Sequence, residues 1–69
     1  MERQSVQSSN IASIGYDEES STLEIEFLNG GIYQYFDVPI NVYQELMSAG
    51  SHGQYLAQQI KGRFRYAKI

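Results

Sequence analysis

The fold is decided by the segment Ile32–Pro39, which reads IYQYFDVP. Its branched and aromatic residues are typical of a β-strand, because such side chains pack well on a pleated surface. The proline that ends the segment has no backbone N–H to donate, and it is tolerated in the first turn of a helix. The segment therefore predicts a central strand followed by helices, and we expect the residues before it to form strands that pair with it.

A second strand is predicted at Thr22–Phe27, where apolar and acidic residues alternate. Leu23, Ile25 and Phe27 would share one buried face, and the two intervening glutamates would face water. An earlier strand is predicted at Asn10–Tyr16, because apolar residues again occupy alternate positions. The first half of the chain is thus expected to be an antiparallel meander of three strands.

The turn Leu28–Gly31 determines which face of the sheet carries Tyr33 and Tyr35. A two-residue Asn-Gly turn would place both tyrosines on the wet face. A three-residue loop with Gly30 in the left-handed position of a β-bulge pairs Ile25 with Tyr33 instead. We favour the bulged turn, because its register gathers the large side chains of both strands on one face.

Two short helices are predicted after the proline. The first begins at Pro39, with Asn41 as an alternative cap, and Gly50 suits the left-handed position at its end. The second begins with a capping box at Ser51, where a serine is followed three residues later by a glutamine. Gly62 is expected to end it.

The two ends of the chain are predicted to differ. Residues 1–7 are polar and are expected to be flexible, whereas residues 63–66 alternate basic and aromatic side chains and predict a short final strand. The fold class is therefore α+β: a three-stranded antiparallel meander covered on one face by two short helices, with a short C-terminal strand, in a single domain of residues 8–69. The predicted core consists of Leu23, Ile25, Phe27, Leu46, Leu56 and Ile60.

Composition narrows the class of protein. The chain has 69 residues and no cysteine, so it can form neither a disulfide nor a thiolate metal site, which fits a reducing compartment. No apolar run approaches the roughly 20 residues that a transmembrane helix needs, and the N-terminus lacks the features of a signal peptide. We expect a soluble cytoplasmic protein that makes no membrane contact.

The basic residues cluster at the end of the chain. Residues 1–60 contain all eight acidic residues and one basic residue, Arg3, whereas residues 61–69 contain four basic residues and no acidic one. An acidic body argues against nucleic-acid binding over the whole surface. The four basic residues either form a local binding patch or keep an exposed edge strand solvated and unpaired. They are Lys61, Arg63, Arg65 and Lys68.

Catalytic chemistry is not indicated. His52 is the only histidine, and it follows Ser51 directly instead of facing it as a base faces a nucleophile. We expect Ser51 to be a helix cap and His52 to be exposed. The sequence therefore predicts no enzyme activity, no metal site and no cofactor.

Two groups of residues could bind a ligand. The helix start at Ser51 and Gly53 could hold a phosphate, although a plain capping box accounts for the same residues. Tyr33 and Tyr35 could form a stacking platform for bases, although tyrosines in a core whose hydroxyls reach the surface give the same pattern. A tyrosine edge left open beside Arg63 and Arg65 would favour nucleic acid.

Short motifs along nearly the whole chain resemble the KTSC family. They are Ser8-Ser9-Asn10-Ile11, Gly15-Tyr16-Asp17, Leu23-x-Ile25-x-Phe27, Asn29-Gly30, Tyr33-x-Tyr35, Val38-Pro39, Val42-Tyr43, Ala49-x-Ser51-x-Gly53-x-Tyr55, Ile60-Lys61 and Tyr66. Domains of that family occur alone in bacteria and their viruses and at the C-terminus of some lysyl-tRNA synthetases. The family has no established activity, and the resemblance implies RNA binding only through the association with the synthetases.

Two functions follow as expectations. The first is a non-catalytic module that binds RNA or another nucleic acid. The second is a small adaptor that self-associates, or a protein that binds a small nucleotide-like ligand. We expect a phosphate-bearing ligand to meet one patch, in which the basic residues after the second helix join the start of that helix. The predicted binding residues are Tyr33, Tyr35, Ser51, Gly53, Lys61, Arg63 and Arg65.

Overall fold

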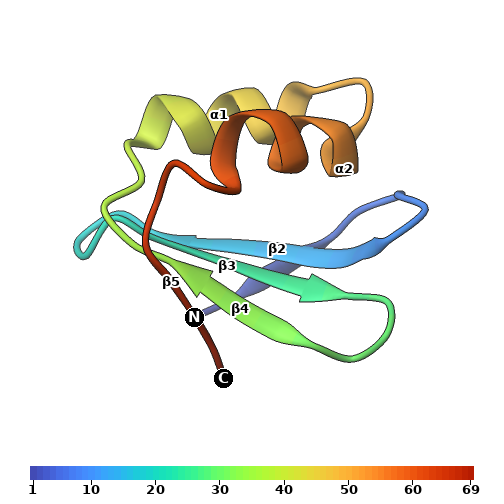
Figure 1. The fold of residues 1–69 in the computed structure, drawn as a ribbon, viewed down its shortest axis with the longest axis horizontal. Helices are drawn as coiled ribbons and strands as arrows, with labels where there is room; N and C mark the ends of the chain where they lie inside the picture. The colour runs from blue at the N-terminus through green and yellow to red at the C-terminus, as the bar shows by residue number, and fades with distance from the viewer.

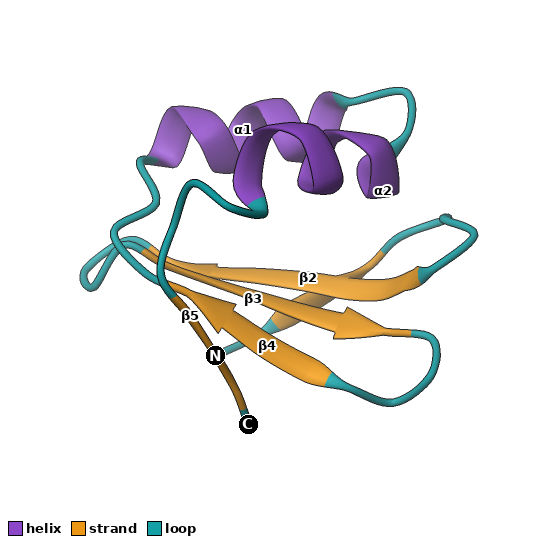
Figure 2. Ribbon diagram, viewed as in Figure 1, coloured by secondary structure: helices purple, strands orange, loops and turns teal.

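One antiparallel sheet of five strands forms the base of the molecule, and its strand order follows the chain. The strands are β1 (Arg3–Ser5), β2 (Ile11–Asp17), β3 (Thr22–Phe27), β4 (Ile32–Tyr35) and β5 (Tyr66–Lys68). The computed structural model describes residues 1–69 and places all helical segments on one face of this sheet (Figures 1 and 2). The predicted α+β architecture is therefore confirmed, with one strand more than the sequence indicated.

The helical layer contains α1 (Ile40–Ser48), α2 (His52–Tyr55) and the π-helical segment η1 (Leu56–Ile60), which continues α2. Figure 1 shows α1 lying side by side with the continuous helix formed by α2 and η1, above β2, β3 and β4. The connection after η1 then descends to β5 at the edge of the sheet. No helix in the structure has both the length and the hydropathy that a transmembrane span requires.

The bulged turn between β3 and β4 is confirmed. Gly30 has a φ of +96°, and its N–H donates to the Phe27 carbonyl at 2.9 Å, while the Phe27 N–H donates to the Gly31 carbonyl at 2.8 Å. Ile25 pairs with Tyr33 in the resulting register. Both tyrosines of β4 consequently lie on the face that the helices cover.

The core lies between the helices and this face of the sheet. Its buried side chains are Ile11, Ile14, Leu23, Ile25, Tyr35, Val38, Val42, Leu46, Leu56 and Ile60. Five of the six predicted core residues are among them, whereas Phe27, at the end of β3, is only half-buried. Ile11 and Ile14 share the inner face although they are three residues apart, because the register shifts at a bulge between Ile11 and Ser13.

The sequence analysis missed β1. It assigned residues 1–7 to a flexible segment, but Arg3–Ser5 pairs with Gly15, Ile14 and Ser13 of β2. These three residues are polar and carry no alternating pattern, so periodicity could not reveal the strand. Backbone pairing with β2 and the long side chain of Arg3 hold β1 in place.

The helix ends confirm one predicted cap and correct two. The Ser51 side chain accepts a hydrogen bond from the Gln54 N–H at 3.3 Å, as the capping box predicts. Gly50 does not end α1 in a left-handed conformation; the chain leaves the helix at Ala49, which is extended (φ −68°, ψ 144°). Pro39 precedes the first helical residue, so the alternative cap at Asn41 is wrong.

The final strand begins three residues later than predicted. Residues 61–64 form a turn and a bend, and β5 starts at Tyr66. Gly62, which has a φ of +84°, lies in this connection, and the chain needs the next residues to cross from the helical layer to the sheet edge. The Arg65 carbonyl then accepts the Phe36 N–H at 2.8 Å and starts the pairing with β4.

Candidate functional site

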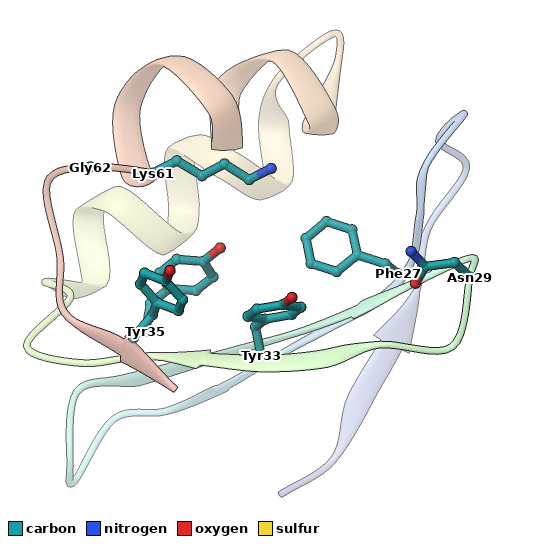
Figure 3. A pocket seen from close by; sticks show the side chains of 7 residues that line it. Phe27, Asn29, Tyr33, Tyr35, Lys61 and Gly62 are labelled. Atoms are coloured by element: carbon teal, nitrogen blue, oxygen red, sulfur yellow. The ribbon is translucent and has the colours of Figure 1, made fainter. Parts of the chain in front are cut away.

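A cleft of about 560 Å³ opens between the inner face of β4 and the end of η1. Figure 3 shows Tyr33 and Tyr35 rising from β4 towards Lys61, which lies opposite them, with Phe27 at the side. We call this feature the aromatic cleft. It is lined by Phe27, Asn29, Tyr33, Tyr35, Lys61, Gly62 and Tyr66.

Strand geometry assembles the aromatic wall. Tyr33 and Tyr35 are two residues apart in β4, so they project from one face, and Tyr66 of β5 pairs directly with Tyr35. The Tyr66 ring centroid lies 5.8 Å from that of Tyr35 and 6.0 Å from that of Tyr33. Phe27 meets Tyr33 edge to face at 5.5 Å. These spacings are those of favourable aromatic pairs, so the wall is a connected cluster.

Three tyrosine hydroxyls in the cleft are not used by the protein. Of the six tyrosines, Tyr16 donates to the Val38 carbonyl and Tyr55 donates to the Glu45 carboxylate at 2.7 Å. The hydroxyls of the cleft tyrosines have no hydrogen-bond partner in the protein, yet no buried polar atom is left unsatisfied, so the hydroxyls of Tyr33 and Tyr35 keep some contact with solvent even though the Tyr35 residue is largely buried. Burial, followed by the nearby Tyr33 and Tyr66, raises the pKa of Tyr35. Its hydroxyl therefore stays protonated and can donate to a ligand.

Two lysines give the cleft a positive charge. Lys61 Nζ lies 5.5 Å from the Phe27 ring centroid, and Lys68 Nζ lies 6.0 Å from that of Tyr33. Neither lysine forms an ion pair with a carboxylate, because the ion pairs of the protein involve only Arg3 and Arg65. No acidic side chain lines the cleft. The site therefore combines ring faces, free hydroxyls and uncompensated cations.

A second hollow, of about 540 Å³, lies beside the aromatic cleft. We call it the arginine groove; its lining residues are Phe36, Gly62, Arg63, Phe64, Arg65 and Tyr66. The Arg63 guanidinium lies 5.7 Å from the Phe64 ring centroid, and that of Arg65 lies 5.8 Å from that of Phe36. Arg65 also forms an exposed ion pair with Asp37 at 3.0 Å. The groove thus presents guanidinium groups stacked near rings.

The structure separates the predicted patch into two places. Ser51 and Gly53 line neither hollow, because they begin α2 whereas Lys61 follows the end of η1. Gly53 instead packs against Asn10, whose side-chain oxygen leaves no room for a Cβ at that position. Neither hollow brings the helix start together with the basic residues, and the expectation that one ligand meets both stays a prediction.

The predicted binding residues do not include Phe27, Asn29, Tyr66 and Lys68, which lie in or beside the cleft. Phe27 was assigned to the core, since its position in the alternating pattern does not show that it stands at the open end of the sheet. Tyr66 and Lys68 alternate in the final segment of the chain, and that pattern could have indicated a shared face with Tyr33 and Tyr35. Only the register of β5 places them there.

His52 lies outside both hollows. It is half-buried rather than exposed as predicted, and its Nδ1 lies 2.8 Å from the Leu46 carbonyl oxygen near the end of α1. A helix C-terminus offers unpaired carbonyls, which accounts for the contact. The His52 side chain thus links α2 to the end of α1.

The chain is similar in sequence to a known domain family and to several known proteins. The model of the KTSC domain matches residues 7–64. A lysine–tRNA ligase from Trichormus variabilis is 44% identical over 54 residues, which make up 78% of this chain and 10% of the ligase. An uncharacterised protein from Stutzerimonas stutzeri is 43% identical over 70 residues, covering 100% of this chain and 99% of that protein.

A solved structure extends the similarity to three dimensions. The crystal structure of a KTSC domain protein from Yersinia pestis superposes with a TM-score of 0.96 at 48% identity, covering 99% of this chain and 96% of that one. The chain spans about a tenth of the length of the ligase and nearly all of the Stutzerimonas protein. The family match covers most of the sequence, and this chain belongs to the KTSC domain family.

Proposed function

We propose that the chain is a non-catalytic module that binds single-stranded RNA through the aromatic cleft. The observation that carries the proposal is the composition of the cleft, in which aromatic rings and unpaired tyrosine hydroxyls lie beside Lys61 without any carboxylate. The volume of about 560 Å³ falls within the range of sites for small molecules and nucleotides.

The chemistry of the cleft suits an unpaired base followed by a phosphate. Bases stack on aromatic side chains, and each stacked base contributes about 1–3 kcal/mol to binding. Tyrosine hydroxyls can hydrogen-bond to the base edge or to the ribose 2′-hydroxyl. Lys61 and Lys68 would contact the phosphates on either side.

The charge distribution favours RNA contact at the end of the molecule that carries the aromatic cleft and the arginine groove. All four basic residues of the last nine lie at or near the cleft and the groove, and the remaining chain holds every acidic residue. The third hollow, beside β1, is lined by Glu2 and Asp17 as well as by Arg3, so it suits a polyanion poorly. RNA would therefore approach from the β5 edge.

The relatives lend support of a different kind. Three of the similar proteins are lysine–tRNA ligases, whose name states that they act on a tRNA. This chain corresponds to about a tenth of such a ligase, so we extend to it only contact with RNA and not the ligase reaction.

A small nucleotide-like ligand is the second candidate. The cleft volume favours it, because the space is enough for one nucleotide without a longer strand. A self-associating adaptor, the other expectation, has support in the open edge of β5, where Tyr66 and Ile69 are more than 60% exposed. The basic residues on that edge would repel a second copy of themselves.

Binding of a fluorescein-labelled hexamer of adenosine RNA, followed by anisotropy at low salt, tests the proposal. Lys61→Gln with Lys68→Gln should weaken binding about tenfold and reduce its salt dependence, since two phosphate contacts are lost. The pair Asn41→Asp and Gln44→Glu changes the net charge equally at exposed positions of α1 and should leave binding within about twofold of the parent.

Two results would contradict the proposal. One is the absence of hexamer binding at low salt; a dimer seen by light scattering would then favour the adaptor. The other is an equal loss of affinity in both charge-changing variants, which would reduce the interaction to net charge.

A further inference from the structure

The aromatic cleft and the arginine groove are neighbours that share Gly62 and Tyr66. Tyr66 is 62% exposed, so its ring stands at the boundary between the two hollows and is accessible from solvent. Gly62 contributes only backbone to both walls, and a Cβ built on it meets no atom within 4 Å. The boundary between the hollows is therefore one tyrosine side chain and not a wall of packed chain.

The two hollows present the same chemistry in different proportions. The cleft has four aromatic rings and one lysine, whereas the groove has three rings and two guanidinium groups. Arginine planes stack on bases and pair with phosphates, so the groove can extend the contacts of a strand whose first nucleotide occupies the cleft. No acidic residue lines either hollow, and the exposed Asp37 pair of Arg65 is of the kind that a phosphate can displace.

We propose that the two hollows form one track, along which a single RNA strand places consecutive nucleotides on either side of Tyr66. One base would occupy the aromatic cleft, the next would lie on the arginine groove, and the linking phosphate would pass over Gly62 beside the Tyr66 hydroxyl. This inference rests on the proposed function and makes it more specific. The ligand class becomes a single strand of at least two nucleotides, because bases in a duplex are paired and stacked on each other.

A length series tests the track. Adenosine 5′-monophosphate and the 5′-phosphorylated adenosine di- and tetranucleotides are titrated into the full chain, and dissociation constants are taken from chemical-shift changes. We expect affinity to rise about tenfold from the mononucleotide to the dinucleotide, as for one added stacking contact. The mononucleotide should shift the ring signals of Phe27 and Tyr33, and the dinucleotide should also shift those of Phe64.

Variants of the groove separate this inference from the proposed function. Arg63→Gln with Arg65→Gln should remove most of the gain from the second nucleotide while leaving mononucleotide affinity within about twofold of the parent. The pair Asn41→Asp and Gln44→Glu should retain the gain, because it alters net charge alone. Far-UV circular dichroism verifies that both proteins are folded.

The outcomes distinguish the two-nucleotide track from the proposed RNA-binding function. Equal affinity for one and two nucleotides, or equal losses for both ligands in the arginine variant, would overturn the track and leave the cleft as a site for one nucleotide. Duplex RNA that competes as well as the single strand would also overturn it. Failure of every ligand to bind would overturn the proposed function itself.

Discussion

Arg3 of β1 reaches across β2 and forms an ion pair with Glu24 of β3. Gly15 lies between them in the sheet, pairing with Arg3 on one side and with Glu24 on the other. A Cβ at Gly15 would lie 2.6 Å from the Glu2 carbonyl oxygen and 3.0 Å from Arg3 Cγ. Glycine at this position therefore leaves room for the Arg3 side chain to pass over β2. Glu24 is consequently only 6% exposed, although its face of the sheet has no helix over it.

Replacing Arg3 by alanine should destabilise the domain. Glu24 would lose its charged partner and keep only the hydrogen bond from Gln34, and removing one partner of a buried polar group costs about 1–3 kcal/mol. Urea unfolding followed by tyrosine fluorescence measures the change. The double variant Arg3→Ala with Glu24→Gln should recover part of the loss, and a single variant as stable as the parent would show that the ion pair does not anchor β1.

Glu24 should also make stability depend on pH. A hydrogen bond from Gln34 (2.8 Å), opposed by burial and assisted by Arg3, lowers the pKa of Glu24 below its ordinary value of 4.5. The folded state therefore holds the proton less tightly than the unfolded state, so this stabilisation is present above pH 4.5 and is lost as the pH falls through the lower folded value. Thermal melts between pH 3 and 7 should show a smaller decline for Glu24→Gln than for the parent, and parallel curves would contradict the assignment.

Truncation of the core should have the largest effect. Ile25→Ala and Leu56→Ala each remove a side chain that is at most 1% exposed, and such changes cost about 2–5 kcal/mol. In a domain this small, that loss approaches the whole free energy of unfolding. Leu28→Ala, at a position that is 60% exposed, is the matched control and should melt within a few degrees of the parent. Similar melting temperatures for all three variants would refute the core assignment.

Asp37→Asn should strengthen RNA binding. The Asp37 carboxylate holds the Arg65 guanidinium at 3.0 Å, where a phosphate would compete with it. Asp37 also has a φ of +58°, a conformation that asparagine tolerates as well as aspartate, so the backbone should be preserved. We expect about a threefold gain in affinity at low salt, since an exposed pair contributes little. Unchanged or weaker binding in the anisotropy assay would show that Arg65 does not contact the ligand.

Local patterns were enough to predict the strands from residues 22 to 35 and their turn. Alternation in Thr22–Phe27 and the glycine pair after Asn29 act within a few residues, and the predicted pairing of Ile25 with Tyr33 is confirmed. The strand β1 is specified by contacts between distant parts of the chain, because Arg3 finds its partner 21 positions away. A periodicity argument does not contain that information.

The candidate site was predicted only in part, because local patterns place some of its residues and long-range contacts place the others. The alternation of Tyr33 and Tyr35 revealed a shared face, and the charge pattern predicted that Lys61 is a binding residue. Their meeting depends on where η1 ends above the sheet, which is a tertiary property. Ser51 was grouped with Lys61 because a helix start and basic side chains both attract phosphate, but a helix holds its two ends apart.

The strand order also governs how the domain can be joined to other chains. Because the order follows the sequence, β1 and β5 are the opposite edges of the sheet, and each is the strand nearest to one terminus. A neighbouring domain fused before Met1 enters at the edge remote from Tyr66 and leaves the aromatic cleft unobstructed. A fusion after Ile69 emerges next to Lys68 and competes for the space that a ligand would need. Affinity tags and surface attachment for binding studies therefore belong at the N-terminus.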